Sequence, residues 1–253
     1  RLSKSEKQTV EATLPERTYN HITVKDPIVM GWHQVTSQSA NSGVSQVVAG
    51  TDLNVISPTW FSLSDNLGNI KSLASSDYVT YCHQNNIQVW GLVSNLENKN
   101  VDTTTVLNTT SYRDSLVNNL ITQAISYDLD GINVDMEALS VSAKDGYIEF
   151  IKELSIKCEK NDIILSVDNY VPSASTAFYN RSVQADYADY IAVMAYDEHY
   201  VGGDEAGSVA SIGFVEKGVA DTLEEVPADQ IILGMPFYAR VWAQSDSGLT
   251  SSA

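Results

Sequence analysis

Carboxylate and amide side chains alternate with apolar ones in residues 127–139, which read YDLDGINVDMEAL. Successive side chains of a β-strand point to opposite faces, so Asn133, Asp135 and Glu137 are predicted to share one face. A polar, acidic row inside a protein is costly unless its members are paired or used. Asp135 and Glu137 would lie about 6–7 Å apart along the strand, where they could serve different atoms of one reacting group. The alternative is a strand-end carboxylate pair that faces solvent or binds a cation.

Apolar strands alternate with amphipathic helices on both sides of this segment. Strands are expected at residues 27–33, 52–63, 87–96, 131–136, 163–171, 188–196 and 230–238. Helices are expected at residues 42–49, 75–86, 109–129, 142–160 and 207–226. This alternation is typical of a parallel sheet covered by helices, which a doubly wound sheet and a (β/α)8 barrel both satisfy. In a barrel the carboxyl ends of the strands carry the active site, and Asp135 and Glu137 fall at such an end.

The acidic segment resembles the D-x-x-D-x-D-x-E signature of glycoside hydrolase family 18, the chitinase-like hydrolases. The residues at the matching positions are Asp130, Asn133, Asp135 and Glu137. Residues 193–199 (VMAYDEH) and 234–240 (GMPFYAR) resemble the sixth and seventh strands of the family, in the correct order. The resemblance covers about residues 27–243 and is greatest to the bacterial LysM-associated branch, which includes spore-cortex and peptidoglycan N-acetylglucosaminidases.

The resemblance implies a (β/α)8 barrel and a retaining hydrolase of β-linked N-acetylglucosamine glycans, of the peptidoglycan or chitin type. Its catalysis would be substrate-assisted, outside the usual two-carboxylate scheme. Glu137 would protonate the glycosidic oxygen, and the substrate's own acetamido oxygen would attack to give an oxazolinium ion. Asp135 would hold the acetamido N–H and Tyr196 the acetamido oxygen, although a strand-end tyrosine can also be a simple core residue. Further substrate contacts are expected from Asn133, Asp130, Met194, Asp197, Tyr238, Arg240 and Trp32.

Asn133 departs from the family, which most often has aspartate at this position. An amide can donate a hydrogen bond but cannot share a titratable proton. Asp135 then has one fewer negative neighbour, so its pKa is expected to be lower than in an Asp–Asp pair.

The ends of the chain give two further expectations. Residues 1–25 are expected to be a linker or a processed segment, and 26–253 the catalytic barrel. Residues 243–253 read as polar and turn-like, so strand eight is expected to be absent from this chain. Self-association at the open barrel edge would then be a corollary, because an open edge leaves backbone groups unpaired.

Composition limits the partners. The chain has 15 Lys and Arg against 32 Asp and Glu, a net charge of −17, which disfavours nucleic acid and anionic membranes and is compatible with a neutral glycan. The acidity could equally serve solubility alone. No apolar run is long enough for a membrane span, no metal site or cofactor motif is present, and Cys82 and Cys158 are expected to be free thiols. An extracellular, cell-envelope or spore-associated location is expected, with any signal or upstream domain outside this chain.

Two other functions stay open at this stage. The first is a chitinase-like lectin that binds carbohydrate without turnover. Loss of the acid glutamate usually marks such lectins, and the presence of Glu137 favours the enzyme. The second is an unrelated α/β enzyme with an acidic strand end.

Overall fold

The structure is a computed structural model that describes residues 27–245 and 248–252. The chain divides into two compact units, Arg1–Leu165 (unit 1) and Ser166–Ala253 (unit 2). The linker predicted at residues 1–25 lies outside the described residues.

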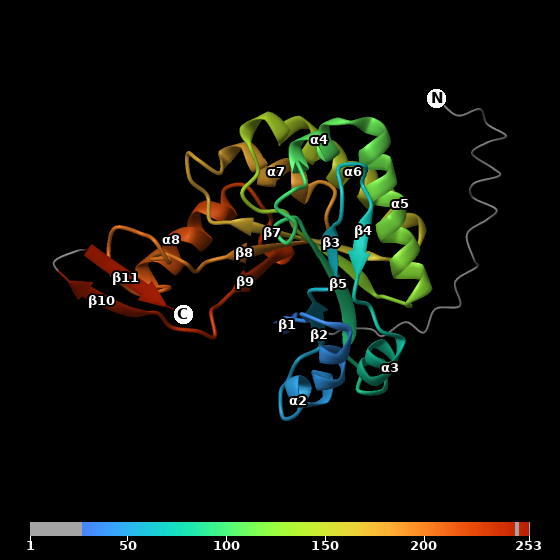
Figure 1. Cartoon of the computed structure of the whole chain (residues 1–253), viewed down its shortest axis with the longest axis horizontal. Coiled ribbons are helices and arrows are strands. Elements are labelled where there is room, and N and C mark those ends of the chain that lie inside the picture. The colour runs from blue at the N-terminus through green and yellow to red at the C-terminus, as the bar shows by residue number, and fades with distance from the viewer. Residues whose placement is uncertain (1–26, 246–247, 253) are drawn as a thin grey trace. The chain divides into compact units, whose positions relative to one another are not determined.

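Unit 1 is built on a parallel sheet. Its strands are β1 (Met30–His33), β2 (Val55–Pro58), β5 (Gln88–Ser94) and β6 (Gly131–Asp135), side by side in that order (Figure 1). All seven residues of β5 are buried, which fits a strand with both faces covered. The strands predicted at 27–33, 87–96 and 131–136 are therefore confirmed.

Helices connect the strands of unit 1 and supply much of its core. They are η1 (Gln38–Gly43), α2 (Val44–Val48), α3 (Ser76–Gln84), α4 (Thr103–Asn108), α5 (Thr110–Ser126), η2 (Val141–Ala143) and α6 (Lys144–Lys160). The expected apolar face of α5 is buried, with Leu116, Leu120 and Ala124 fully covered. Helices α4, α5 and α6 pack on one another (Figure 1). The sequence pattern predicts α2, α3, α5 and α6, but not α4 or the two 3-10 helices η1 and η2.

The strand predicted at residues 52–63 is divided in two. β2 ends at Pro58, and β3 (Phe61–Leu63) resumes pairing with the same neighbour, β5. The register shifts by one residue, because Ile56 pairs with Val89 whereas Phe61 pairs with Val93. This bulge turns β3 into a hairpin with β4 (Ile70–Ser72), which the sequence analysis did not predict.

Unit 2 continues the alternation of strand and helix. Its parallel strands are β7 (Ile164–Tyr170, which begins in unit 1), β8 (Tyr190–Met194) and β9 (Ile231–Gly234). Its helices are η3 (Ala177–Tyr179), α7 (Arg181–Ala185), α8 (Ile212–Leu223) and η4 (Ala228–Gln230). These strands confirm the ones predicted at 163–171, 188–196 and 230–238.

The turn-like structure predicted for residues 243–253 is wrong. β10 (Val241–Ser245) and β11 (Gly248–Ser252) form an antiparallel hairpin instead, with Trp242 opposite Ser251 and Gln244 opposite Leu249. Valine, tryptophan and threonine favour extended backbone, and Gly248 adopts a φ of 128° where the chain enters β11. Their extended pairing outweighs the polar composition on which the prediction rested.

Candidate active site

The acidic row begins inside the sheet of unit 1. Asn133 is fully buried in β6, and its side-chain oxygen accepts hydrogen bonds from Trp32 Nε1 at 3.0 Å and Ser57 Oγ at 2.9 Å. Side chains from β1, β2 and β6 therefore meet on the face predicted for the row. Trp32 lies beside Asn133 as a hydrogen-bond donor, and its proposed contact with substrate stays a prediction.

Asp135 is the last residue of β6 and is half-buried. One of its carboxylate oxygens, Oδ1, is buried and has no hydrogen-bond partner among the described residues. Burial and, to a lesser extent, the negative charges of Glu137 and Glu97 together raise the pKa of Asp135 to about 7. A buried acceptor without a donor is costly in a folded protein, so the oxygen is suited to an N–H supplied by a ligand.

Glu97 is an acidic neighbour that the sequence analysis missed. It lies three residues beyond the end of β5 and accepts a short hydrogen bond from the Ser94 hydroxyl. Ser94 is the residue of β5 directly paired with Asp135 in β6. The loss of the family's aspartate at Asn133 is thus partly offset by a carboxylate from the next strand.

Glu137 lies two residues beyond the end of β6, and a side chain holds its backbone there. Its N–H donates to Asn95 Oδ1 at 2.8 Å, and Asn95 Nδ2 donates back to the Glu137 carbonyl oxygen at 3.0 Å. The next residue, Ala138, has a φ of 50°, in the left-handed region that alanine rarely adopts. The chain therefore turns sharply immediately after Glu137.

Asp130, predicted to bind substrate, lies instead at the amino end of β6. The five residues of the strand, about 16 Å at 3.3 Å each, separate it from the carboxyl end. Its carboxylate is buried, accepts from the Val89 N–H at 2.8 Å and lies 2.8 Å from His83 Nε2. The structure does not bring Asp130 to the other residues of the row, so its observed role is to join β6 to β5 and α3.

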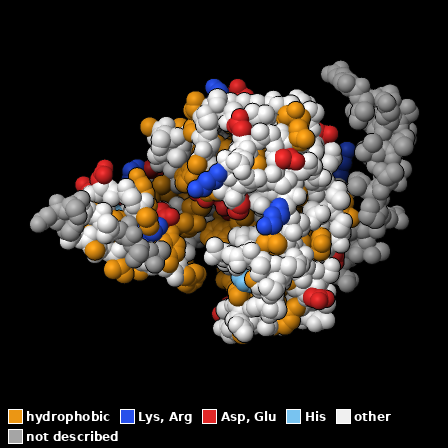
Figure 2. All heavy atoms as spheres, viewed as in Figure 1, with side chains coloured by type: hydrophobic (Ala, Val, Ile, Leu, Met, Phe, Trp, Pro, Cys, Tyr) orange, Lys and Arg blue, Asp and Glu red, His pale blue; other side chains and the backbone are white. Residues whose placement is uncertain are grey.

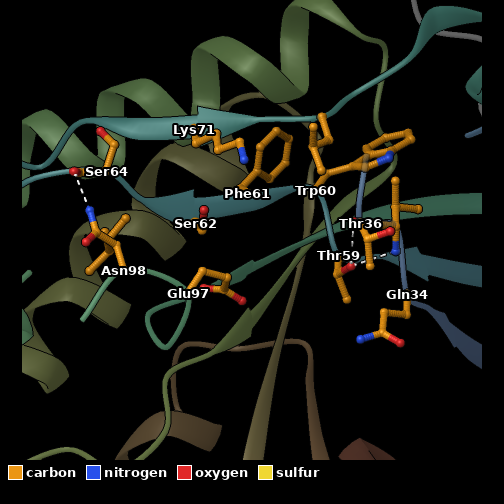
Figure 3. A pocket seen from close by; sticks show the side chains of 13 residues that line it. Gln34, Thr36, Thr59, Trp60, Phe61, Ser62, Ser64, Lys71, Glu97 and Asn98 are labelled. Carbon is orange, nitrogen blue, oxygen red and sulfur yellow. Dashed lines mark hydrogen bonds between the residues drawn. The ribbon is translucent and has the colours of Figure 1, made fainter. Parts of the chain in front are cut away.

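A pocket of about 490 Å³ opens at the carboxyl ends of β1, β2 and β5 (Figure 3). Polar side chains from these strand ends and from the β3–β4 hairpin line it, namely Gln34, Thr36, Thr59, Lys71, Glu97 and Asn98. Trp60 and Phe61 lie among them, and both are buried. Glu97 belongs to this pocket and also acts on Asp135, so the pocket adjoins the acidic row.

A second group of predicted residues lies together in unit 2. Asp197, three residues past the end of β8, accepts hydrogen bonds from Tyr238 Oη at 2.7 Å and from Arg240 at 2.5 Å. The Arg240 guanidinium also lies 5.4 Å from the centre of the Tyr238 ring. Tyr196 packs edge-on against Tyr238, with ring centres 6.3 Å apart, and Met194 is buried at the end of β8. These contacts join four of the five residues predicted from the two strand-end motifs, all except Met194.

Several other residues of unit 1 lie in or beside its core. Trp60 and Trp90 are core residues, and His33 bonds to Tyr78 through Nδ1 at 2.8 Å as a structural histidine. Cys82 and Cys158 are free and buried, as predicted.

Two features are absent from the part of the chain that the structure describes. None of its helices is long and apolar enough to cross a membrane. It contains no cluster of three His, Cys, Asp or Glu side chains arranged to hold a metal ion. On the face shown in Figure 2, lysine and arginine side chains are scattered and form no continuous basic patch.

Comparison with known proteins places these features in a family. Residues 37–252 match the family described as Glycosyl hydrolases family 18. The uncharacterized glycosylase YvbX of Bacillus subtilis (strain 168) is 29% identical over 80% of this chain and 61% of that protein. The cortical fragment-lytic enzyme of the same organism is 25% identical over 70% of this chain and 41% of that enzyme. The chain thus spans less than two thirds of the length of either relative.

Solved structures show the same fold. The chitinase from Chromobacterium violaceum ATCC 12472 superimposes with a TM-score of 0.72 at 23% identity, over 83% of this chain and 68% of that chain. This likeness confirms the α/β barrel class that the family resemblance implied. Because the family match extends over residues 37–252, most of its length, the chain belongs to glycosyl hydrolase family 18.

Proposed function

We propose that the protein is a retaining N-acetylglucosaminidase that cleaves β-linked N-acetylglucosamine glycans by substrate-assisted catalysis. The observation that carries the proposal is the pair of carboxylates at the end of β6. The buried Oδ1 of Asp135 has no donor among the residues that the structure describes, and Glu137 follows two residues later on a backbone held by Asn95. Such a pair can serve an acetamido N–H and a leaving oxygen of the same sugar.

In the first step, Glu137 gives its proton to the glycosidic oxygen as the bond from that oxygen to the anomeric carbon breaks. The carbonyl oxygen of the substrate's 2-acetamido group forms a new bond to the anomeric carbon from the opposite face. The product is an oxazolinium ion, and the leaving sugar departs with the proton. No protein carboxylate attacks the sugar, which is the family's exception to the two-carboxylate scheme.

In the second step, Glu137 is a carboxylate and accepts a proton from the incoming water. The water oxygen bonds to the anomeric carbon, the oxazolinium ring opens, and the acetamido group is restored. Two successive attacks from opposite faces retain the β-configuration. Glu137 ends the cycle protonated, as it began.

Asp135 is proposed to accept the acetamido N–H through its free Oδ1. With a pKa raised to about 7, its carboxyl is poised to ionise near neutral pH. The positive charge that develops on the oxazolinium ion favours the ionised form, because an opposite charge nearby lowers a carboxyl pKa. Asp135 therefore stabilises the charged intermediate more than the neutral substrate, as catalysis requires.

Tyr196 is proposed to bind the acetamido oxygen, as the family motif implies. Asp197, Tyr238 and Arg240 are proposed to contact the sugar. Their mutual bonds support the proposal, because they fix the guanidinium and the phenol in one arrangement and so reduce the entropy lost on binding.

The polymer is proposed to be peptidoglycan or a chitin-type glycan, acted on outside the cell, in the cell envelope or in the spore. The names of the relatives, a cortical fragment-lytic enzyme and chitinases, support both polymers. The pocket beside Glu97 is proposed to hold a neighbouring sugar of the chain. Its volume of about 490 Å³ and the polar side chains that line it suit a sugar ring, which can form hydrogen bonds at its rim.

The test is to incubate the protein with chitooligosaccharides and with peptidoglycan glycan strands, and to follow the products by proton NMR. New reducing ends that appear first as the β-anomer would support the proposal. A matched oligosaccharide with free amino groups in place of the acetamido groups should not be cleaved. Initial release of the α-anomer would contradict substrate assistance, and an oligosaccharide that binds but is never cut would indicate a lectin.

A further inference from the structure

We propose that Asn95 is a positioning residue that sets the orientation of the acid Glu137; this inference rests on the proposed function. The observation is the reciprocal pair of hydrogen bonds between the Asn95 amide and the Glu137 backbone, 2.8 Å for N–H to Oδ1 and 3.0 Å for Nδ2 to the carbonyl oxygen. Asn95 does not belong to the family motif at residues 130–137, and the sequence analysis did not select it.

The pair replaces backbone pairing where the ladder ends. Strands β5 and β6 pair from Trp90 with Gly131 to Ser94 with Asp135, and no further rung follows. One residue beyond Ser94, the Asn95 side chain presents a donor and an acceptor to Glu137, as a strand backbone would. Asparagine suits this position because its amide carries both groups on a short side chain.

The position is also one where the chain needs support. Ala138 has a φ of 50°, which costs an L-residue of its kind about 1 kcal/mol or more. Such a conformation persists only where the surroundings impose it. The two bonds from Asn95 fix the peptide groups on both sides of the Glu137 Cα, so they fix the direction of its Cα–Cβ bond.

Asn95 is itself held. Its side chain is 9% exposed, and its Nδ2 donates a second bond to Thr103 Oγ1 at 3.2 Å, at the first residue of α4. The hydrogen bonds of Asn95 thus connect the Glu137 backbone to the start of α4 as well as to the end of β5.

The variant Asn95→Ala removes both bonds to Glu137. We expect kcat on an N-acetylglucosamine oligosaccharide to fall about 10- to 100-fold, with KM changed less than about threefold, because the proton donor is misaligned while substrate contacts persist. Thr103→Val keeps both bonds between Asn95 and Glu137 but removes the bond from Asn95 Nδ2 to Thr103 Oγ1. We expect a smaller decrease of kcat in this variant. It also covers the case in which Asn95→Ala does not fold.

The matched control is Asn54→Ala. Asn54 makes the same kind of two-way clamp at the amino end of the sheet, accepting from the Val29 N–H at 2.8 Å and donating to the Pro27 carbonyl at 2.9 Å. A merely structural role predicts comparable losses of stability and of activity in both alanine variants. Our inference predicts that only Asn95→Ala loses kcat out of proportion to its change in melting temperature.

A second readout does not depend on turnover. In protein labelled with carbon-13 at glutamate side-chain carboxyls, the Glu137 resonance is identified by its absence in Glu137→Gln. We expect it to shift or broaden in Asn95→Ala and to stay unchanged in Asn54→Ala. An unchanged resonance in Asn95→Ala, or an unchanged kcat, would overturn the inference. A parent protein without turnover, or an active Glu137→Gln variant, would instead contradict the proposed function and leave the resonance to decide on Asn95.

Discussion

Replacing Asp135 by asparagine is expected to stabilise the protein increasingly as the pH rises from about 5 to about 8. Burial, followed by the charges of Glu137 and Glu97, raises the pKa of Asp135 in the folded state from its ordinary value of 3.8 to about 7. Between these two values the folded protein binds more protons at this site than the unfolded chain. Stability at this site is therefore lost as the pH rises through the interval, and the full penalty is present above about pH 7.

The size of the effect follows from the same two values. A rise from 3.8 to about 7 corresponds to about 4 kcal/mol, since each tenfold change in proton affinity is about 1.4 kcal/mol. About 1.5 kcal/mol of this penalty is already present at pH 5, which leaves about 2–3 kcal/mol to develop by pH 8. Asp135 is half-buried, and water reduces the effect, so we expect Asp135→Asn to gain about 1–3 kcal/mol over this range.

The assay is urea unfolding of both proteins at about pH 5, 6, 7 and 8, above the isoelectric point of 4.4. Asp65→Asn is the control, because hydrogen bonding from the Asn69 side chain lowers the pKa of Asp65. Loss of that carboxylate is expected to lower stability by the same amount at every pH from 5 to 8, because the pKa lies below this range in both the folded and the unfolded state. An Asp135→Asn variant whose advantage is the same at pH 5 and pH 8 would refute the reasoning.

Three further substitutions test the fold around the site. Asp130→Ala should lower the free energy of unfolding by about 2–4 kcal/mol, because His83 and the Val89 N–H lose the buried carboxylate that they bond to. The KM of this variant should be unchanged, and a raised KM would instead support the predicted contact between Asp130 and substrate. Glu153→Gln should lower the free energy of unfolding in urea by about 1–2 kcal/mol, because the buried Arg113 loses a bidentate ion pair whose acidic member is partly exposed. An unchanged free energy of unfolding would contradict this account. Gly68→Ala should lower the free energy of thermal unfolding by at least about 2 kcal/mol, because Gly68 has a φ of 83° and a Cβ there would overlap a backbone carbonyl of α5. A melting temperature equal to that of the parent protein would be inconsistent with that packing.

The periodicity of the sequence was sufficient to predict the main strands and helices. A buried parallel strand is a continuous apolar run, and helices such as α5 show one apolar face over several turns. Periodicity is weak in an element as short as α4, with six residues, or β3 and β4, with three each, so α4 and the β3–β4 hairpin were missed. The β10–β11 hairpin was misjudged because its polar residues pair in an extended form that composition alone does not reveal.

The candidate site was predicted in part for a similar reason. Alternation placed Asn133 and Asp135 on one face of β6, since both belong to the strand. The motif does not report how far its members lie from one another, and the structure places Asp130 at the amino end of β6, so its contact with substrate stays a prediction. Asn95 and Glu97 were missed because they lie in the loop after β5. Side chains in a loop follow no regular alternation, so their direction cannot be predicted from their spacing in the sequence. Their roles depend on a neighbouring strand that is about 40 residues away in the sequence.

The central claim is that Glu137 gives and takes the proton during hydrolysis. The most direct measurement is kcat for reducing-end release from one β-linked N-acetylglucosamine oligosaccharide by the protein and by Glu137→Gln, at the same pH. The amide keeps the size of the side chain but has no proton to exchange, so kcat should fall by about 100-fold or more while the melting temperature is retained. Equal kcat values in two folded proteins would contradict the account.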